Sequence, residues 1–157
     1  VNKNIMIAVV PPKAEHKEVE IFTEAEIKKL LTSLKDSEKY SKYYPLVYTA
    51  ISTGARLGEI LGLKSNAVKS GHIVINNNVQ YGNNVPTDFP PKTKAGNRKI
   101  TISRELESIL KRKSIDKIIS FDGYIFHTKN GTPYRTFDIG SLVVVIGSGN
   151  FPIMIAP

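Results

Sequence analysis

Residues 53–63 read T-G-A-R-L-G-E-I-L-G-L, which places an arginine directly before an apolar helical pattern. The guanidinium of Arg56 is a planar fork of N–H donors that can bind two oxygens of one phosphate. Gly54 allows the backbone to approach a ligand closely, and the start of a helix adds N–H donors and positive potential. The pattern indicates an anion-binding arginine. The alternative is an arginine solvated on the surface, which is the commoner state of an arginine considered alone.

A second group of cations lies in the segment P-P-K-T-K-A-G-N-R-K-I-T-I-S, around a predicted Ala95-Gly96 hairpin turn. Its members are Lys92, Lys94, Arg98 and Lys99. A lysine in such a turn can protonate a leaving oxygen or pair with phosphates, because its pKa shifts readily when it loses water. The alternative is a solvated hairpin with charged edges.

Helical periodicity predicts the elements that surround Arg56. Thr23 and Glu26 form a T-x-x-E capping box before a helix with apolar residues at 27, 30, 31 and 34. A second helix is expected over about 42–52, with Pro45 in its first turn, and Thr53-Gly54 ends it. Arg56 then starts the next helix. Ser103 is the expected cap of a later helix that ends in K-R-K.

Short apolar runs with a period of two predict strands at 72–75, 79–81 and 99–102, and a further short strand at 124–126. Asn130-Gly131 marks the tip of a later turn. The resulting fold class is α+β, mainly helical with a small antiparallel β-sheet or hairpin.

The two ends of the sequence differ in composition from the rest. Residues 1–20 contain a stretch rich in proline and charge, P-P-K-A-E-H-K-E-V-E, and are interpreted as a linker or lead-in segment. Residues 136–157 form an atypical hydrophobic tail with one charged residue, Asp138. Its V-V-V-I-G-S-G-N-F-P run resembles a dinucleotide-binding turn, but it has Pro152 at the third glycine position and no following helix.

The composition favours a folded cytoplasmic protein with a polyanionic partner. The 157 residues carry 22 Lys and Arg against 14 Asp and Glu, a net charge of +8, with a pI near 9.6. Such a balance is typical of nucleic-acid-binding proteins. Cysteine is absent, the three histidines lack metal-ligand spacing, and no apolar run is long enough to cross a membrane. We therefore expect neither a metal nor a membrane partner.

Together, T-G-A-R-x-G-E-x-L-x-L, the preceding capped helix and the basic turn between strands resemble the tyrosine recombinase or phage-type integrase family. The resemblance covers about residues 21–135, the N-terminal part of the catalytic domain, and implies a partial tyrosine-recombinase catalytic core. Arg56 matches the first catalytic arginine and Glu59 the acidic position beside it. Lys94 best matches the catalytic lysine, with Lys92 as the rival.

This resemblance implies site-specific DNA cleavage and rejoining in a mobile genetic element, through a phosphotyrosyl intermediate and without a cofactor or metal. Double-stranded DNA is the implied partner, contacted also by Lys92, Arg98 and Lys99. Homo-oligomerisation on the DNA is left open.

The sequence departs from the family pattern after the basic turn. The family has an H-x-x-R box, whereas His127 is followed by Thr-Lys-Asn, and no tyrosine follows Tyr134. We therefore expect this chain by itself to be an incomplete catalyst that forms no covalent link to DNA. The alternatives are a catalytically incomplete DNA-binding or regulatory module, and a basic interaction domain with an accidental resemblance.

Overall fold

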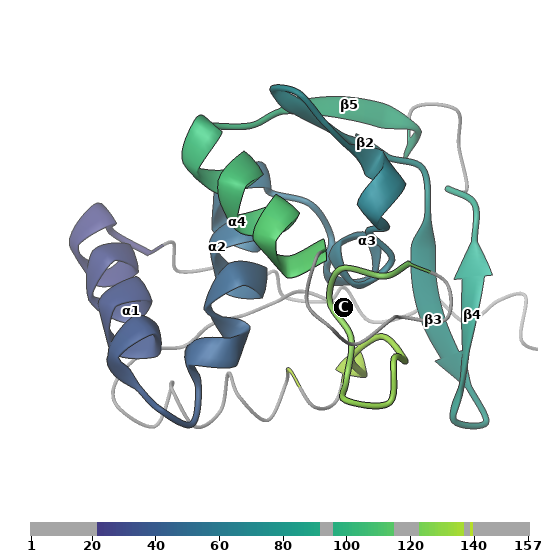
Figure 1. Ribbon diagram of the computed structural model, residues 1–157, viewed down its shortest axis with the longest axis horizontal. Helices are drawn as coiled ribbons and strands as arrows, with labels where there is room; N and C mark the ends of the chain where they lie inside the picture. Colours follow the sequence, from purple (N-terminus) through teal and green to yellow (C-terminus); the bar gives the residue numbers. More distant parts are fainter. Residues whose placement is uncertain (1–21, 92–95, 115–122, 137–138, 140–157) are drawn as a thin grey trace, which may run out of the picture.

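The computed structural model describes residues 22–91, 96–114, 123–136 and 139, with helices at one end and short strands at the other (Figure 1). The helices are α1 Glu24–Asp36, α2 Tyr44–Thr53, α3 Leu57–Leu61 and α4 Arg104–Ser114, with the 3-10 turns η2 Ser41–Tyr43 and η3 Ser65–Ala67. The strands are β1 Val68–Lys69, β2 His72–Ile75, β3 Asn78–Gly82, β4 Val85–Phe89 and β5 Arg98–Thr101. The predicted α+β class is confirmed.

The predicted capping box at the start of α1 is present. The Thr23 N–H donates to Glu26 Oε2 over 2.8 Å, and the Glu26 N–H donates to Thr23 Oγ1 over 3.3 Å. These bonds satisfy amides that have no partner inside the helix. The same helix buries Leu30 and Leu34, two members of the predicted apolar face.

Helix α2 ends at Gly54, which adopts a left-handed conformation with φ of 60°. A side chain at this position would strain the backbone, so glycine suits the turn. The Gly54 N–H donates to the Ala50 carbonyl over 2.9 Å and closes the helix. The chain then reverses direction, so that Arg56 precedes α3.

The strands form two ladders rather than the single sheet expected. One ladder has the order β1-β2-β5 and the other pairs β3 with β4, and all neighbours are antiparallel. Strand β4 was not predicted, because V-P-T-D-F has only two large apolar residues and a proline. Pro86 is tolerated because β4 has one pairing partner among the described residues and is therefore an edge strand.

Two further predictions of local structure were wrong. The connection from β4 to β5 is not a hairpin turn, because β4 pairs with β3 and β5 with β2. Residues 124–126 form no strand: Tyr124 makes an isolated bridge with Lys64, and the Ile125 N–H donates to the Leu63 carbonyl over 2.9 Å. Backbone geometry confirms the predicted turn at Asn130-Gly131, where Gly131 has φ of 79°.

The hydrophobic core lies between α2, α3, α4 and the β1-β2-β5 ladder. Its fully buried side chains include Leu61, Ile73, Leu106, Leu110 and Phe126. Ile139, from the segment that follows residue 135, is also fully buried there. The predicted linker, residues 1–20, lies outside the described residues, as does the predicted hydrophobic tail, residues 136–157, apart from Thr136 and Ile139.

Helix α3 packs very closely on β3 (Figure 1). A Cβ atom at Gly58 would clash with the Asn78 side chain and would lie 3.1 Å from the Val79 carbonyl oxygen. The glycine at this position therefore permits the close approach. This packing gives α3 a fixed position relative to the strands, which matters because Glu59 lies on the same helix.

Among the described residues, no helix combines the length and the apolar character needed to cross a membrane.

Candidate functional site

Arg56 lies in the extended turn between α2 and α3, directly before Leu57. Its side chain is 81% exposed, and its backbone N–H donates to Glu59 Oε2 over 2.9 Å. The buried side chains of Ala55 and Leu57 flank it and hold this turn against the core. The sequence suggested that a helix dipole would strengthen anion binding at Arg56. Helix α3 has only five residues, so its dipole adds little positive potential at this position. The guanidinium itself is the prominent feature.

Glu59 lies beneath Arg56 and is one of two buried polar or charged residues in the described part of the chain. Its carboxylate is bound by Arg98, whose two terminal nitrogens lie 3.0 and 2.9 Å from the two carboxylate oxygens. The Arg56 guanidinium makes a longer contact of 3.4 Å to Glu59 Oε1. One carboxylate thus joins two arginines that lie 42 positions apart in the sequence.

These contacts change the pKa of both partners in the main ion pair. Burial alone would raise the pKa of Glu59, but the hydrogen bonds from Arg98 and from the Arg56 backbone outweigh it, and the pKa lies below its ordinary value. The hydrogen bond to Glu59 raises the pKa of Arg98 further. Both groups are therefore charged at neutral pH, and the cluster of Arg56, Glu59 and Arg98 carries a net positive charge.

The structure brings together three of the six residues predicted as site residues. Arg98, predicted as a DNA-binding residue, has both terminal nitrogens on Glu59. Lys99 follows it in β5 and lies on the opposite face of the strand, because side chains alternate along a strand. Lys92 and Lys94 lie outside the described residues. Their predicted convergence with Arg56 therefore stays a prediction.

Sequence analysis did not identify a second cluster, centred on Asp88 in β4. The Asp88 carboxylate accepts hydrogen bonds from Lys64 Nζ, the Asn77 side-chain amide and the Tyr124 hydroxyl, at 2.6, 2.8 and 2.6 Å. Lys64 Nζ also lies 4.9 Å from the centre of the Tyr124 ring. The partners lie 11 to 36 positions away in the sequence, so no local motif signals the cluster.

The Asp88 cluster joins the β3-β4 ladder to the end of α3 and to the bridge at Tyr124. Burial would raise the pKa of Asp88, but the hydrogen bonds from Asn77, Lys64 and Tyr124 more than compensate and lower it. The carboxylate is therefore ionised at neutral pH and can hold all three partners.

We expect the substitution Asp88→Ala to destabilise the chain by about 1–2 kcal/mol, because three hydrogen bonds are lost at a site that is partly exposed and partly screened. Urea unfolding measures this change. Asp36→Ala, which removes an exposed carboxylate at the end of α1, is the matched control and should change stability by less than about 0.5 kcal/mol. If the two substitutions lowered the stability equally, the hydrogen bonds to Asp88 would have no special role in stabilising the fold.

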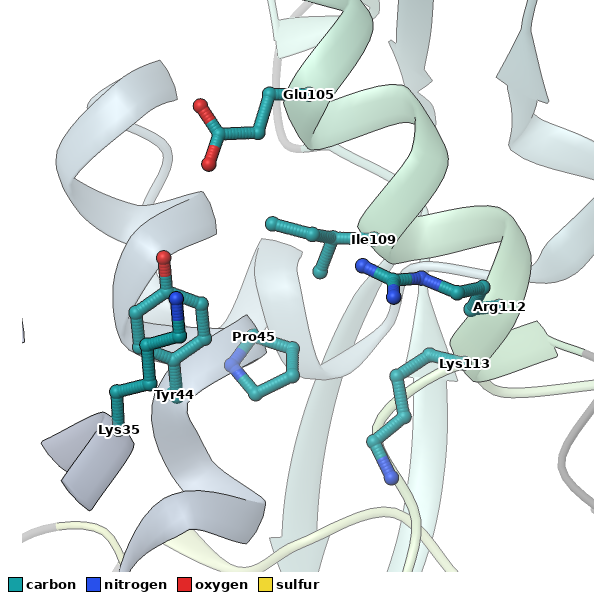
Figure 2. Close-up of a pocket in the computed structure, with 7 residues that line it drawn as sticks. All are labelled: Lys35, Tyr44, Pro45, Glu105, Ile109, Arg112 and Lys113. Carbon is teal, nitrogen blue, oxygen red and sulfur yellow. The ribbon is translucent and has the colours of Figure 1, made fainter.

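A separate groove of about 440 Å³ lies between α1, α2 and α4 (Figure 2). Its lining residues are Lys35, Tyr44, Pro45, Glu105, Ile109, Arg112 and Lys113. Figure 2 shows Ile109 and Pro45 near the middle of the groove and the charged side chains around them. None of the residues of the Arg56–Glu59–Arg98 cluster lines this groove, so it is a distinct surface feature. No group of three or more His, Cys, Asp or Glu in the described ranges could hold a metal ion.

Comparison with solved structures decides the fold. The Tn1549 transposon integrase in complex with a circular intermediate DNA superposes with a TM-score of 0.76 at 20% identity, over 88% of this chain and 47% of that one. The fold of the chain matches the integrase catalytic-domain region. XerA recombinase superposes with a TM-score of 0.59 at 21% identity, over 88% of this chain and 45% of its own. The predicted resemblance to tyrosine recombinases and phage-type integrases is therefore confirmed, and at these identities the structural likeness establishes the fold.

Sequence comparison finds relatives of this chain among transposases. The transposase from transposon Tn916 of Enterococcus faecalis and the transposase from transposon Tn1545 of Streptococcus pneumoniae are each 29% identical over 111 residues. The match covers 66% of this chain and 27% of either transposase, so the chain spans about a quarter of the length of these relatives. No family model matches the sequence.

Proposed function

We propose that this integrase-fold chain is part of a DNA recombinase of the tyrosine recombinase type. The recombinase would belong to a mobile genetic element and would act on double-stranded DNA in the cytoplasm. Residues 21–135 would form the N-terminal part of its catalytic domain. The fold, the similarity to two transposases and the DNA bound in the Tn1549 integrase structure support this proposal.

The observation that carries the proposal is that the Arg56 guanidinium is exposed and makes only one long contact. Its side chain is highly exposed, while the buried Glu59 beneath it is already bound bidentately by Arg98. An arginine with one weak contact retains most of its donors for a ligand, and a phosphate is the anion whose geometry matches the guanidinium fork. The surrounding turn is held by the core, so that little ordering is needed on binding.

In the proposed reaction a tyrosine hydroxyl attacks a DNA phosphorus, the bond to the 5′ oxygen breaks, and a 3′-phosphotyrosyl link forms. The 5′ hydroxyl of a second strand then reverses this step. Arg56 would stabilise the negative charge on the pentacovalent phosphorane, and Glu59 would hold the turn that presents Arg56. Lys94, with Lys92 as the rival, would protonate the departing 5′ oxygen.

A second candidate is a DNA-binding or regulatory module that does not cleave. His127 favours it, because the residue three positions on is Asn130 rather than an arginine, and the His127 backbone forms a bridge with Pro133 beside a turn. The two candidates differ in one measurable property. Only the complete recombinase of which this chain is proposed to be a part would form a protein–DNA link that survives denaturing electrophoresis on a nicked duplex substrate.

We expect the chain to bind duplex DNA with a steep dependence on salt, since its net charge of +8 favours contacts to phosphates that release counterions. Fluorescence anisotropy of a labelled duplex, measured from low to physiological salt, should show a loss of affinity of about tenfold or more over a few-fold rise in salt. A parallel series with heparin separates duplex binding from general attraction to polyanions. A flat salt series with duplex DNA would contradict the proposal.

A further inference from the structure

The Glu59 carboxylate is shared unequally by the two arginines beside it. Arg98 binds it with both terminal nitrogens, at 3.0 and 2.9 Å, whereas the Arg56 guanidinium has one contact of 3.4 Å. Arg98 is mostly covered, with 32% of its side chain exposed, while Arg56 is 81% exposed. The covered arginine therefore holds the carboxylate, and the exposed one makes only a marginal contact.

The unequal binding of Glu59 by the two arginines has a geometric cause. Arg98 is placed by the pairing of β5 with β2, where it lies opposite Ile75, one of the fully buried core residues. Glu59 lies on α3, which packs closely on β3. Two rigid elements thus hold the carboxylate and the Arg98 fork face to face. Arg56 instead reaches Glu59 only across the first turn of its own short helix.

A carboxylate within reach of an arginine competes with any phosphate for the same donors, because both anions bind the guanidinium fork in two-point geometry. Glu59 is three residues from Arg56 and already within 3.4 Å of it. If Arg98 did not occupy both carboxylate oxygens, Glu59 would be free to bind Arg56 bidentately. The donors of Arg56 would then be taken up within the protein.

We infer that Arg98 is a positioning residue for Arg56: by occupying Glu59, it prevents that carboxylate from capturing the Arg56 guanidinium and keeps the guanidinium available for a phosphate. Arg98 acts through Glu59 and needs no contact with DNA of its own. The consequence for DNA binding rests on the proposed function, but the arrangement of the three side chains does not.

The arrangement is tested first without DNA, by NMR of the arginine side chains in the 157-residue chain. Rotation of a guanidinium is slow when a carboxylate holds it bidentately, and its terminal N–H signals are then resolved. In the unsubstituted chain we expect resolved signals for Arg98 and averaged signals for Arg56. In Arg98→Met the Arg56 signals should become resolved. If they stay averaged in a folded Arg98→Met chain, the inference is overturned.

Arg98→Lys extends the test in case Arg98→Met does not fold. Lysine keeps the positive charge but cannot bind both carboxylate oxygens as a fork, so that one oxygen becomes accessible to Arg56. Slower rotation of Arg56 in Arg98→Lys than in the unsubstituted chain supports the inference, and unchanged rotation overturns it.

The consequence for DNA binding is tested with a single and a double substitution. Arg98→Met should weaken binding of a labelled duplex by about tenfold, which is the scale of one lost charge-assisted contact. Adding Glu59→Gln should restore most of this affinity, because the competing charge is removed. Lys69→Met, an exposed cation at the end of β1, controls for the loss of one positive charge.

If Arg98 contacted DNA directly, or served stability alone, Glu59→Gln would not restore binding, and that result would overturn the inference. If no variant alters DNA binding although the Arg56 signals change as expected, the proposed function fails and the positioning role of Arg98 stands.

Discussion

Replacement of Glu59 by alanine is expected to destabilise the chain by about 2–4 kcal/mol, one of the largest effects that any single polar residue would have here. The substitution leaves the partly covered Arg98 without its carboxylate and removes the acceptor of the Arg56 backbone N–H. Both losses occur at the junction of α3 with β5. Thermal or urea unfolding followed by circular dichroism measures the change.

Glu59→Gln is the matched control, because it keeps the size of the side chain and one carbonyl acceptor while it removes the charge. We expect a smaller loss of stability than for alanine. A Glu59→Ala chain as stable as the unsubstituted one would show that the ion pair with Arg98 contributes nothing to the fold.

The same carboxylate gives stability a dependence on pH. The pKa of Glu59 in the folded chain lies below its ordinary value of 4.5, so its stabilising contribution is fully present above that value. It is lost as the pH falls from 4.5 through the folded pKa, because protonation then favours the unfolded chain. Glu59→Gln should remove this part of the acid dependence.

The second large effect concerns DNA. Arg56→Ala is expected to lower the affinity for duplex DNA by about tenfold, and the slope of log affinity against log salt should become shallower by about one. Stability should change by less than about 1 kcal/mol, because the side chain is exposed and makes only one long ion pair. Fluorescence anisotropy over a salt series and urea unfolding measure the two quantities.

Two variants show whether the fork or only the charge of Arg56 matters. Arg56→Lys should keep the salt slope but lose part of the affinity, since an ammonium cannot bind two phosphate oxygens as a planar fork. Lys28→Ala removes an exposed cation from α1 and should have a much weaker effect. If Lys28→Ala and Arg56→Ala weaken binding equally, Arg56 has no special role in phosphate binding.

Helix signals in the sequence were reliable where they depended on neighbouring residues. The cap at Thr23, the proline in the first turn of α2 and the cap at Ser103 are all present in the structure. Each relies on a hydrogen bond or a backbone preference that acts within about four positions. The strands were predicted less well, because the assignment of β3 and β5 to different ladders depends on contacts between distant segments.

The sequence by itself determined the helices around Arg56, the end of the preceding helix at Thr53-Gly54 and the strongly basic character of the chain. These follow from local hydrogen bonding, from backbone sterics and from composition. Only the tertiary structure decided that Arg98 binds Glu59, 39 positions away, and leaves Arg56 exposed. It likewise decided that Asp88 holds Lys64 and Tyr124. Such pairs depend on strand register and on the close approach of α3 to β3, and neither is specified by residue types within a short window.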